Sequence, residues 1–147
     1  MGRSNQNREE KTMKTVYLAG PMDFATDEQM TGWRKESYRF LGLDFEILDP
    51  VRRPHTCNLT DKEIFNLDMI DVRNSDILLV DCRDLGICSF GTPCEVFYAA
   101  YILNKPVIGW YDKETKPSGK GVFQNALIDR RFESLSEALT HILRFYK

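Results

Sequence analysis

Residues 77–80 form an unbroken apolar run, Ile-Leu-Leu-Val, which is typical of a β-strand buried on both faces of a sheet. Other short runs rich in apolar residues lie at 15–19, 45–48 and 106–110. The segments between these runs carry apolar residues at helical spacing or begin like helices, which predicts helices at 27–43, 60–74, 92–103 and 134–146. Strands and helices therefore alternate along most of the chain.

Alternating strands and helices favour βαβ units with a parallel sheet and right-handed crossovers. The sequence therefore predicts one α/β domain over residues 15–147, with a flavodoxin-like or Rossmann-like three-layer fold and a parallel sheet of about five strands. In such sheets ligands bind beyond the carboxyl ends of the strands, where the strand order reverses. We therefore expect functional residues in the loops at 20–24, 49–57 and 81–95 and in the segment after Trp110.

The composition excludes several classes of protein. The 147 residues are 42% hydrophobic and 29% charged, which is typical of a single globular domain. The net charge of −2, without a basic block, argues against a duplex nucleic-acid binder. No apolar run approaches the roughly 20 residues that a bilayer span requires. We therefore expect a small-molecule partner, with neither nucleic acid nor a membrane.

Residues 1–14 are polar and of mixed charge, which predicts a disordered N-terminal tail. The four cysteines, which lack paired C-x-x-C spacing, are Cys57, Cys82, Cys88 and Cys94. Their spacing indicates reduced thiols in a cytoplasmic protein. His55 and Cys57 have no partner pair at zinc-site spacing, so we predict neither a metal nor a cofactor.

Glu95 is the carboxylate whose position is most suggestive of chemistry. It lies near the predicted start of a helix, after a loop that contains Gly91, and there the helix dipole favours the ionised form. An ionised carboxylate at this edge of the sheet suits a nucleophile or a base. Thr92 and Glu95 also have the spacing of a capping box, and spacing alone favours that interpretation.

Three further positions have two interpretations each. Tyr17 fits an ordinary core tyrosine, but its phenol would also come within reach of a carboxylate in the cleft. Asp68 and Asp71 share one helix face, either as a solvated acidic face or with one carboxylate turned into the site. Asp81 ends a buried strand, where it either binds a ligand or caps the next turn.

Taken together, these residues resemble the nucleoside 2-deoxyribosyltransferase family and the related 2'-deoxynucleoside 5'-monophosphate N-glycosidases. The resemblance extends from residue 16 to about 128, in segments at 17–21, 49–50, 66–68, 74–77, 91–95 and 99–100. It implies a cofactor-independent enzyme that cleaves the N-glycosidic bond of 2'-deoxyribonucleosides and transfers the sugar to another nucleobase or to water.

The resemblance also implies a role for each site residue. Glu95 becomes the nucleophile that forms a covalent deoxyribosyl intermediate, with net retention at the anomeric carbon. Tyr17 would orient Glu95, and Asp68 would contact the substrate and assist protonation of the leaving base. The substrate-binding positions that it implies are Gly20, Pro21, Met22, Asp49, Ser89, Gly91 and Asn125.

The residues that would meet the 5' end of the substrate give mixed indications. Ser89 stands where the transferases carry an aspartate for the 5'-hydroxyl and the N-glycosidases a serine that helps bind phosphate. Asn125 resembles the asparagine that transferases supply from a neighbouring subunit, which implies a homo-oligomer with shared active sites. Pro21 and Asp23 replace the serine and arginine of the N-glycosidases. A transferase is therefore the leading prediction, with a monophosphate N-glycosidase and a non-catalytic nucleotide-sensing module as alternatives.

Overall fold

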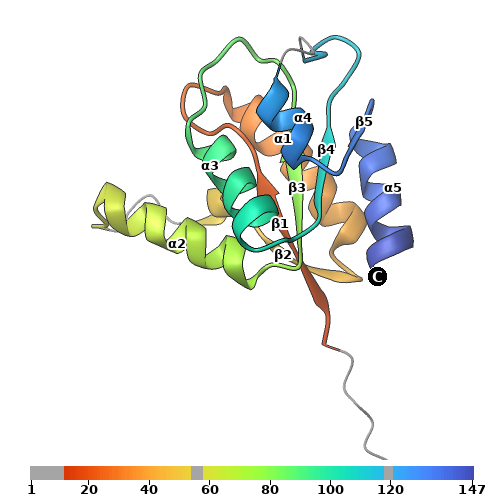
Figure 1. Ribbon diagram of the computed structural model, residues 1–147, viewed down its shortest axis with the longest axis horizontal. Helices are drawn as coiled ribbons and strands as arrows, with labels where there is room; N and C mark the ends of the chain where they lie inside the picture. The colour runs from red at the N-terminus through yellow and green to blue at the C-terminus, as the bar shows by residue number, and fades with distance from the viewer. Residues whose placement is uncertain (1–11, 54–57, 118–120) are drawn as a thin grey trace, which may run out of the picture.

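The computed structural model of the protein describes residues 12–53, 58–117 and 121–147 (Figure 1). The strands are β1 (Lys14–Ala19), β2 (Phe45–Leu48), β3 (Ile77–Asp81), β4 (Val107–Trp110) and β5 (Arg130–Phe132). The α-helices are α1 (Asp27–Leu41), α2 (Asp61–Asn74), α3 (Gly91–Phe97), α4 (Val122–Leu127) and α5 (Leu135–Tyr146). A 3-10 helix, η1 (Pro50–Arg52), follows β2, and a π-helical turn, η2 (Tyr98–Ile102), continues α3. Most of the predicted tail lies outside the described residues.

The five strands form one parallel sheet in the order β2-β1-β3-β4-β5. The central strands β1 and β3 pair directly, with Tyr17 beside Leu78, and every residue of β3 is buried. This arrangement confirms the predicted α/β, flavodoxin-like fold. The strand order reverses between β1 and β3, so the loops that follow these two strands are where a ligand site is expected.

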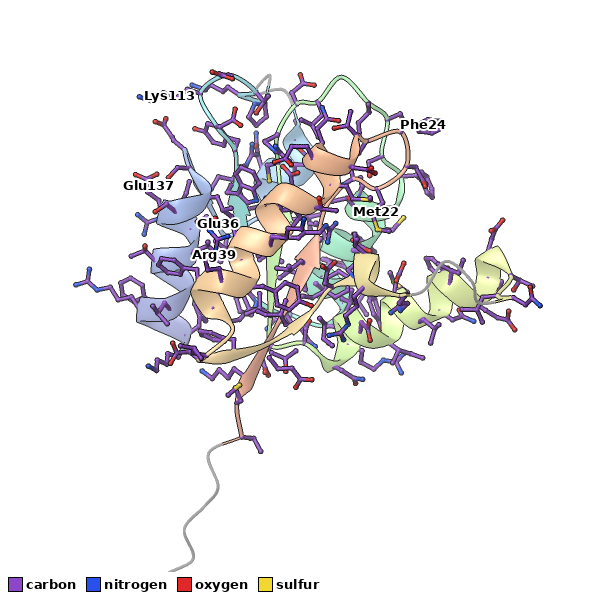
Figure 2. The ribbon with its side chains drawn as sticks, turned by 180° about the vertical axis from the view of Figure 1, so that it is seen from behind. Met22, Phe24, Glu36, Arg39, Lys113 and Glu137 are labelled. Atoms are coloured by element: carbon purple, nitrogen blue, oxygen red, sulfur yellow. The ribbon has the colours of Figure 1, made fainter. Side chains whose placement is uncertain are left out.

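Helices cover both faces of the sheet (Figure 1). On one face Val16 and Leu18 pack in a core with α1 and α5, and Figure 2 shows these two helices from behind. On the other face Tyr17 packs in a second core with α2, α3 and η2. Successive side chains of a strand point to opposite faces. The alternation along β1 therefore directs Tyr17 towards α3.

The helix α2 projects beyond the body of the protein at its N-terminal end (Figure 1). Its predicted capping box is confirmed: the Glu63 backbone N–H donates to the Thr60 hydroxyl, and the Thr60 backbone N–H donates to the Glu63 carboxylate. Residues 61–66 are exposed, and Val72 is the one α2 residue that is fully buried. At the C-terminal end, Lys105 Nζ donates to the carbonyls of residues 72, 73 and 75.

Two elements of the C-terminal third were not located from the sequence. The helix α4 is six residues long, and β5 is a three-residue edge strand that contains two arginines, so neither carries a clear apolar pattern. The five strands agree with the predicted number, although only four had been assigned to residues. None of the helices in the described ranges is long and apolar enough to cross a bilayer.

Candidate active site

Tyr17 and Glu95 form a buried hydrogen-bonded pair on the α3 side of the sheet. The Tyr17 phenol donates to Glu95 Oε1 at 2.7 Å, and Glu95 is only 7% exposed. Tyr17 comes from the middle of β1, and Glu95 comes from the second turn of α3, which packs over that strand. Two side chains that are far apart in sequence therefore meet because strand and helix share one core.

The capping-box interpretation of Glu95 is wrong. The helix α3 begins at Gly91 with Phe90 before it, so Thr92 lies inside the helix, and no side chain caps its start. The burial of Glu95 also opposes the ionised form that its position near the start of a helix favours. Burial raises the pKa of Glu95 to about 8, although the hydrogen bond from Tyr17 acts in the opposite direction. At neutral pH the carboxyl is therefore mostly protonated.

The Tyr17 phenol stays protonated for the same reasons. Burial is the main cause that raises the pKa of Tyr17, and the nearby carboxyls of Glu95 and Asp68 raise it further. The phenol is therefore a permanent hydrogen-bond donor to Glu95 over the whole working pH range.

Of the two aspartates on α2, Asp68 and Asp71, it is Asp68 that acts on Tyr17 and Glu95. Its charge raises the pKa of both. Its own pKa is raised by burial, and Arg53 opposes that shift. Arg53 donates to Asp68 and also to Asp71, and these side chains are only 21–23% exposed. The pair is therefore a half-buried ionic cluster and not a solvated acidic face.

Arg34 is a buried cation whose role was not predicted from the sequence. Its Nη1 donates to the Leu18 carbonyl at 2.8 Å and to Asp49 at 3.0 Å, and its Nη2 donates to the Gly20 carbonyl at 3.1 Å. Asp49 also accepts the backbone N–H of Val51 at 3.0 Å. The predicted substrate contact at Asp49 thus lies in a buried ion pair that supports the loop after β1. An arginine within an amphipathic helix gives no sequence signal for such a role.

A cleft of about 240 Å³ lies beyond the carboxyl ends of β1 and β3 and reaches α3 at Thr92. Pro21 and Ser89 line it, and the Ser89 hydroxyl donates to the Thr92 hydroxyl at 3.0 Å. Glu95 is not among its lining residues but lies one helical turn after Thr92. The cleft therefore contacts α3 at Thr92, one helical turn before the residue that pairs with Tyr17.

Asp81 caps the turn after β3, as one of its two interpretations predicts. Its carboxylate accepts a hydrogen bond from the backbone N–H of Arg83 at 3.1 Å and forms a 2.8 Å ion pair with the guanidinium of Arg83. Arg83 also donates to the Gln29 carbonyl at 2.9 Å and lies over the Trp110 ring. Both charged groups line the cleft, but they are already paired with each other.

The remaining predicted binding residues occupy different settings. At Gly20, a Cβ would lie 2.8 Å from the Trp33 ring, so close packing requires the glycine. Met22 is partly buried on the loop before α1, where Figure 2 labels it. Gly91 is exposed at the start of α3. Asn125 is exposed on α4, next to Gln124, which lines the cleft.

The described ranges contain no group of three or more His, Cys, Asp or Glu side chains arranged to hold a metal ion. Cys82 is buried, Cys88 is exposed, Cys94 lies between these extremes, and all three are free thiols. His55 and Cys57 lie outside the described residues.

No family model matches this sequence, and no curated protein matches it in sequence. Solved structures do match the fold. The 2-desoxiribosyltransferase of Leishmania mexicana matches with a TM-score of 0.68 and 20% identity, over 91% of this chain and 99% of that chain. A 2-deoxyribosyltransferase from Bacillus psychrosaccharolyticus matches with a TM-score of 0.64 and 23% identity, over 85% and 90%.

A CMP N-glycosidase from Clostridium botulinum also matches, with a TM-score of 0.61 and 17% identity, over 91% of this chain and 100% of that chain. The structural neighbours thus include 2-deoxyribosyltransferases and an N-glycosidase that acts on a nucleoside monophosphate. Identities this low show a shared fold, so the activity is argued from the residues of this chain.

Proposed function

We propose that the protein belongs to the nucleoside 2-deoxyribosyltransferase family and cleaves the N-glycosidic bond of 2'-deoxyribonucleosides, passing the sugar to another nucleobase or to water. The observation that carries this proposal is the buried Glu95 carboxyl, bound by Tyr17 at 2.7 Å and with its pKa raised to about 8. A module that only binds a ligand has no use for such a carboxyl, whereas catalytic groups commonly show a shifted pKa. The fold shared with deoxyribosyltransferases supports the same assignment.

In the proposed reaction, Glu95 first gives up its proton to solvent, and the ionised carboxylate, the minor form in the free protein at neutral pH, attacks the anomeric carbon from the side opposite the base. An ester C–O bond forms as the glycosidic C–N bond breaks, and the bonding electron pair stays on the base, which takes up a proton. A second nucleobase, or water, then gives up a proton, attacks the same carbon and releases the carboxylate. Two inversions give net retention.

Tyr17 and Asp68 assist these two steps. The phenol of Tyr17 binds Oε1 and so leaves Oε2 of Glu95 to attack. Burial raises the pKa of Asp68 above that of an ordinary carboxyl, which suits a group that delivers a proton to the leaving base. The charge interaction between Asp68 and Glu95 supports a position for Asp68 close to the reacting atoms.

The charges around Ser89 favour a nucleoside over a nucleoside monophosphate. The cleft beside Ser89 is lined by two carboxylates, Asp81 and Asp84, and by Arg83, whose guanidinium is already bound to Asp81. A phosphate dianion would meet net negative charge there, whereas a neutral 5'-hydroxyl would not. The Ser89 hydroxyl, which carries no charge, is the observation that keeps the monophosphate N-glycosidase as the second candidate.

The proposed active form is a homo-oligomer in which Asn125 completes the site of a neighbouring subunit. Asn125 is exposed on α4, so it is free to contact another copy. Exposed apolar side chains on α4, α3 and η2 support self-association, namely Val122, Phe97, Tyr101 and Ile102. Closed symmetric oligomers place a loop or helix of one protomer beside the site of its partner in this way.

The proposal is tested by incubating the protein with deoxyadenosine or deoxycytidine and a second free base, and separately with the matching 5'-monophosphates. Chromatography that detects a new deoxynucleoside, absent with Glu95→Ala, supports the transferase. Release of free base from monophosphates alone would establish the N-glycosidase instead. Ligand binding without any turnover would leave the nucleotide-sensing module and overturn both enzymatic candidates.

Ser89→Asp sharpens the choice of substrate. An added carboxylate beside the 5' position should lower turnover of monophosphates much more than turnover of nucleosides. Cys88→Asp places the same charge on the neighbouring exposed side chain and serves as the matched control. Equal effects of the two variants on both substrates would show that Ser89 does not contact the 5' end.

A further inference from the structure

Arg53 is the one guanidinium in the described ranges that binds two carboxylates at once. Its Nη1 donates to Asp68 and its Nη2 donates to Asp71. The two aspartates lie on one face of α2, while Arg53 directly follows η1. The contact therefore ties the chain after β2 to the middle of α2, on the side where Asp68 acts on Glu95.

Near Asp68, α2 packs against the second core through the partly buried Met69. The preceding residues 61–66 are exposed, and the buried anchor of the helix, Val72, lies one turn further on. The Asp68 side chain is itself 21% exposed, so it can rotate towards solvent. The like charge of an ionised Glu95 would favour that rotation, which would move Asp68 away from the proposed reaction centre.

Arg34 is the other guanidinium whose charge acts on Asp68, but its hydrogen bonds are directed elsewhere. Its Nε donates to Met30, and its two terminal nitrogens donate to Leu18, Gly20 and Asp49. Arg34 thus contributes to the local potential without contacting Asp68. Within the described part of the chain, the hydrogen-bonded support of Asp68 comes from Arg53.

We propose that Arg53 is a positioning residue of the active site: anchored by Asp71, its guanidinium holds the Asp68 carboxylate beside Glu95. The consequence for catalysis rests on the proposed function, because it assumes that Asp68 assists departure of the base. The placement of Asp68 by Arg53 does not depend on the proposed function and can be measured separately. A planar guanidinium suits this task because its two terminal nitrogens bind two carboxylates in a fixed relative geometry.

The charges around the two carboxyls give the direction of the electrostatic effect. Arg53 lowers the pKa of both Asp68 and Glu95, so loss of its charge alone should raise both. Rotation of Asp68 into solvent would instead relieve the burial that raises its pKa, and the pKa of Asp68 should fall. The other groups that act on Glu95 are Tyr17, Asp68 and Arg34, and those that act on Asp68 are Asp71 and Arg34.

The experiment compares Arg53→Ala and Arg53→Lys with Arg52→Ala. Arg52 is the matched control, because it belongs to the same short helix but donates to the Ile47 carbonyl and not to a carboxylate. Circular dichroism establishes the folded fraction of each variant. Carboxyl 13C NMR then measures the titration of Asp68, and steady-state assays measure kcat, KM and their pH dependence.

With Arg53→Ala we expect kcat for deoxynucleoside cleavage to fall by roughly 10- to 100-fold, as for other small displacements of a reacting group. KM should change little. Arg53→Lys should recover part of the rate, because it restores one charge without bridging both aspartates. Arg52→Ala should match the wild type.

A pKa of Asp68 that rises in Arg53→Ala would show that the carboxyl stays buried without its cation, and would overturn the positioning role. A pKa of Asp68 that falls in Arg53→Ala, but not in Arg52→Ala, supports the placement even if the wild type turns over no nucleoside. Absence of nucleoside turnover by the wild type would overturn the proposed function but not the placement of Asp68. An unchanged Asp68 titration would overturn the positioning role, whatever the activity. An equal loss of kcat in Arg53→Ala and Arg52→Ala, at equal folded fraction, would also overturn it.

Discussion

The phenol of Tyr17 donates a 2.7 Å hydrogen bond to the carboxyl of Glu95, which lies 78 positions further along the chain. Tyr17 lies beside Leu78 in the central pair of strands, and Glu95 lies on a helix that packs over them. The geometry of this contact is therefore set by the packing of the core and not by a loop. A rigid, water-poor setting is what electrostatic preorganisation of a reacting carboxyl requires.

Replacing the proposed nucleophile should abolish turnover without loss of the fold. Glu95→Gln keeps the size of the side chain and its capacity to accept a hydrogen bond from Tyr17, but it cannot form the sugar ester. We expect the rate to fall by roughly 10⁴-fold or more. Steady-state assays check this, and intact-mass spectrometry of the wild type with a 2'-fluorinated substrate should detect an adduct on Glu95. An adduct on another residue would contradict the assignment.

The same substitution should change how stability depends on pH. The folded pKa of Glu95, about 8, lies above its ordinary value of 4.5. The stability that the buried neutral carboxyl contributes is therefore fully present below pH 4.5 and is lost as the pH rises to about 8. Across this window the wild type should lose up to about 1.4 kcal/mol of unfolding free energy per pH unit relative to Glu95→Gln. Urea titrations at several pH values measure the difference, and parallel curves would refute it.

Removing the phenol hydroxyl should slow the reaction and move its pH dependence. The hydrogen bond from Tyr17 lowers the pKa of Glu95, so Tyr17→Phe should raise that pKa. The acid limb of the kcat/KM profile should therefore shift to higher pH. The rate should fall by roughly 10- to 1000-fold, since one preorganised donor is worth about 1.5–4 kcal/mol in a transition state.

Tyr111→Phe is the matched control for this variant, because it removes an exposed 3.2 Å hydrogen bond from a tyrosine to Glu133. It should leave rate and pH profile unchanged. A purely structural Tyr17 would show reduced stability and a normal rate in the folded fraction.

The proposed sharing of sites between subunits makes activity depend on concentration. Asn125→Ala should raise KM for nucleosides, and dilution of the wild type to monomers should remove activity. Analytical ultracentrifugation and assays over the same concentration range check both expectations. Thr140→Ala, on the exposed side of α5, is the control and should have no effect. A fully active monomer would exclude the role of Asn125.

Lys105 should stabilise the end of α2 that packs on the sheet. Its ammonium group donates to the carbonyls of Val72, Arg73 and Ser75 at the C-terminal end of α2, where the last turn of a helix has carbonyls left over for such donors. Lys105→Met should therefore reduce the free energy of unfolding by about 1–3 kcal/mol. It should also speed hydrogen exchange in α2 more than in α5. Lys116→Met, on an exposed loop, is the control, and equal destabilisation by both would contradict this role.

The sequence was sufficient for the central part of the fold, because buried parallel strands carry their pattern in consecutive residues. The strand β2 lies where it was predicted, and the capping box at Thr60 marks the start of α2 correctly. The edge strand β5 could not be predicted, because an edge strand needs little apolar surface and tolerates two arginines. Local patterns thus locate the elements that bury their own side chains.

The candidate site was harder, since its contacts join distant elements. Thr92 and Glu95 have capping-box spacing, yet tertiary packing turns Glu95 to Tyr17. Arg34 and Arg53 bind carboxylates 15–18 positions away, and no local periodicity identifies such partners. The resemblance to a known family drew attention to Tyr17, Asp68 and Glu95, but the two arginines that act on them needed the three-dimensional structure.

Gly20 restricts how this protein can change by mutation. A Cβ at this position would lie 2.8 Å from the Trp33 ring and 3.0 Å from Asp81, so any replacement must displace the core at the mouth of the cleft. Gly91, at the start of α3, has nothing within 4 Å of the same added atom in the described part of the chain. Substitution by a larger residue is therefore tolerated at the start of α3 but unfavourable at the end of β1, where the residue between the strand and its loop stays glycine.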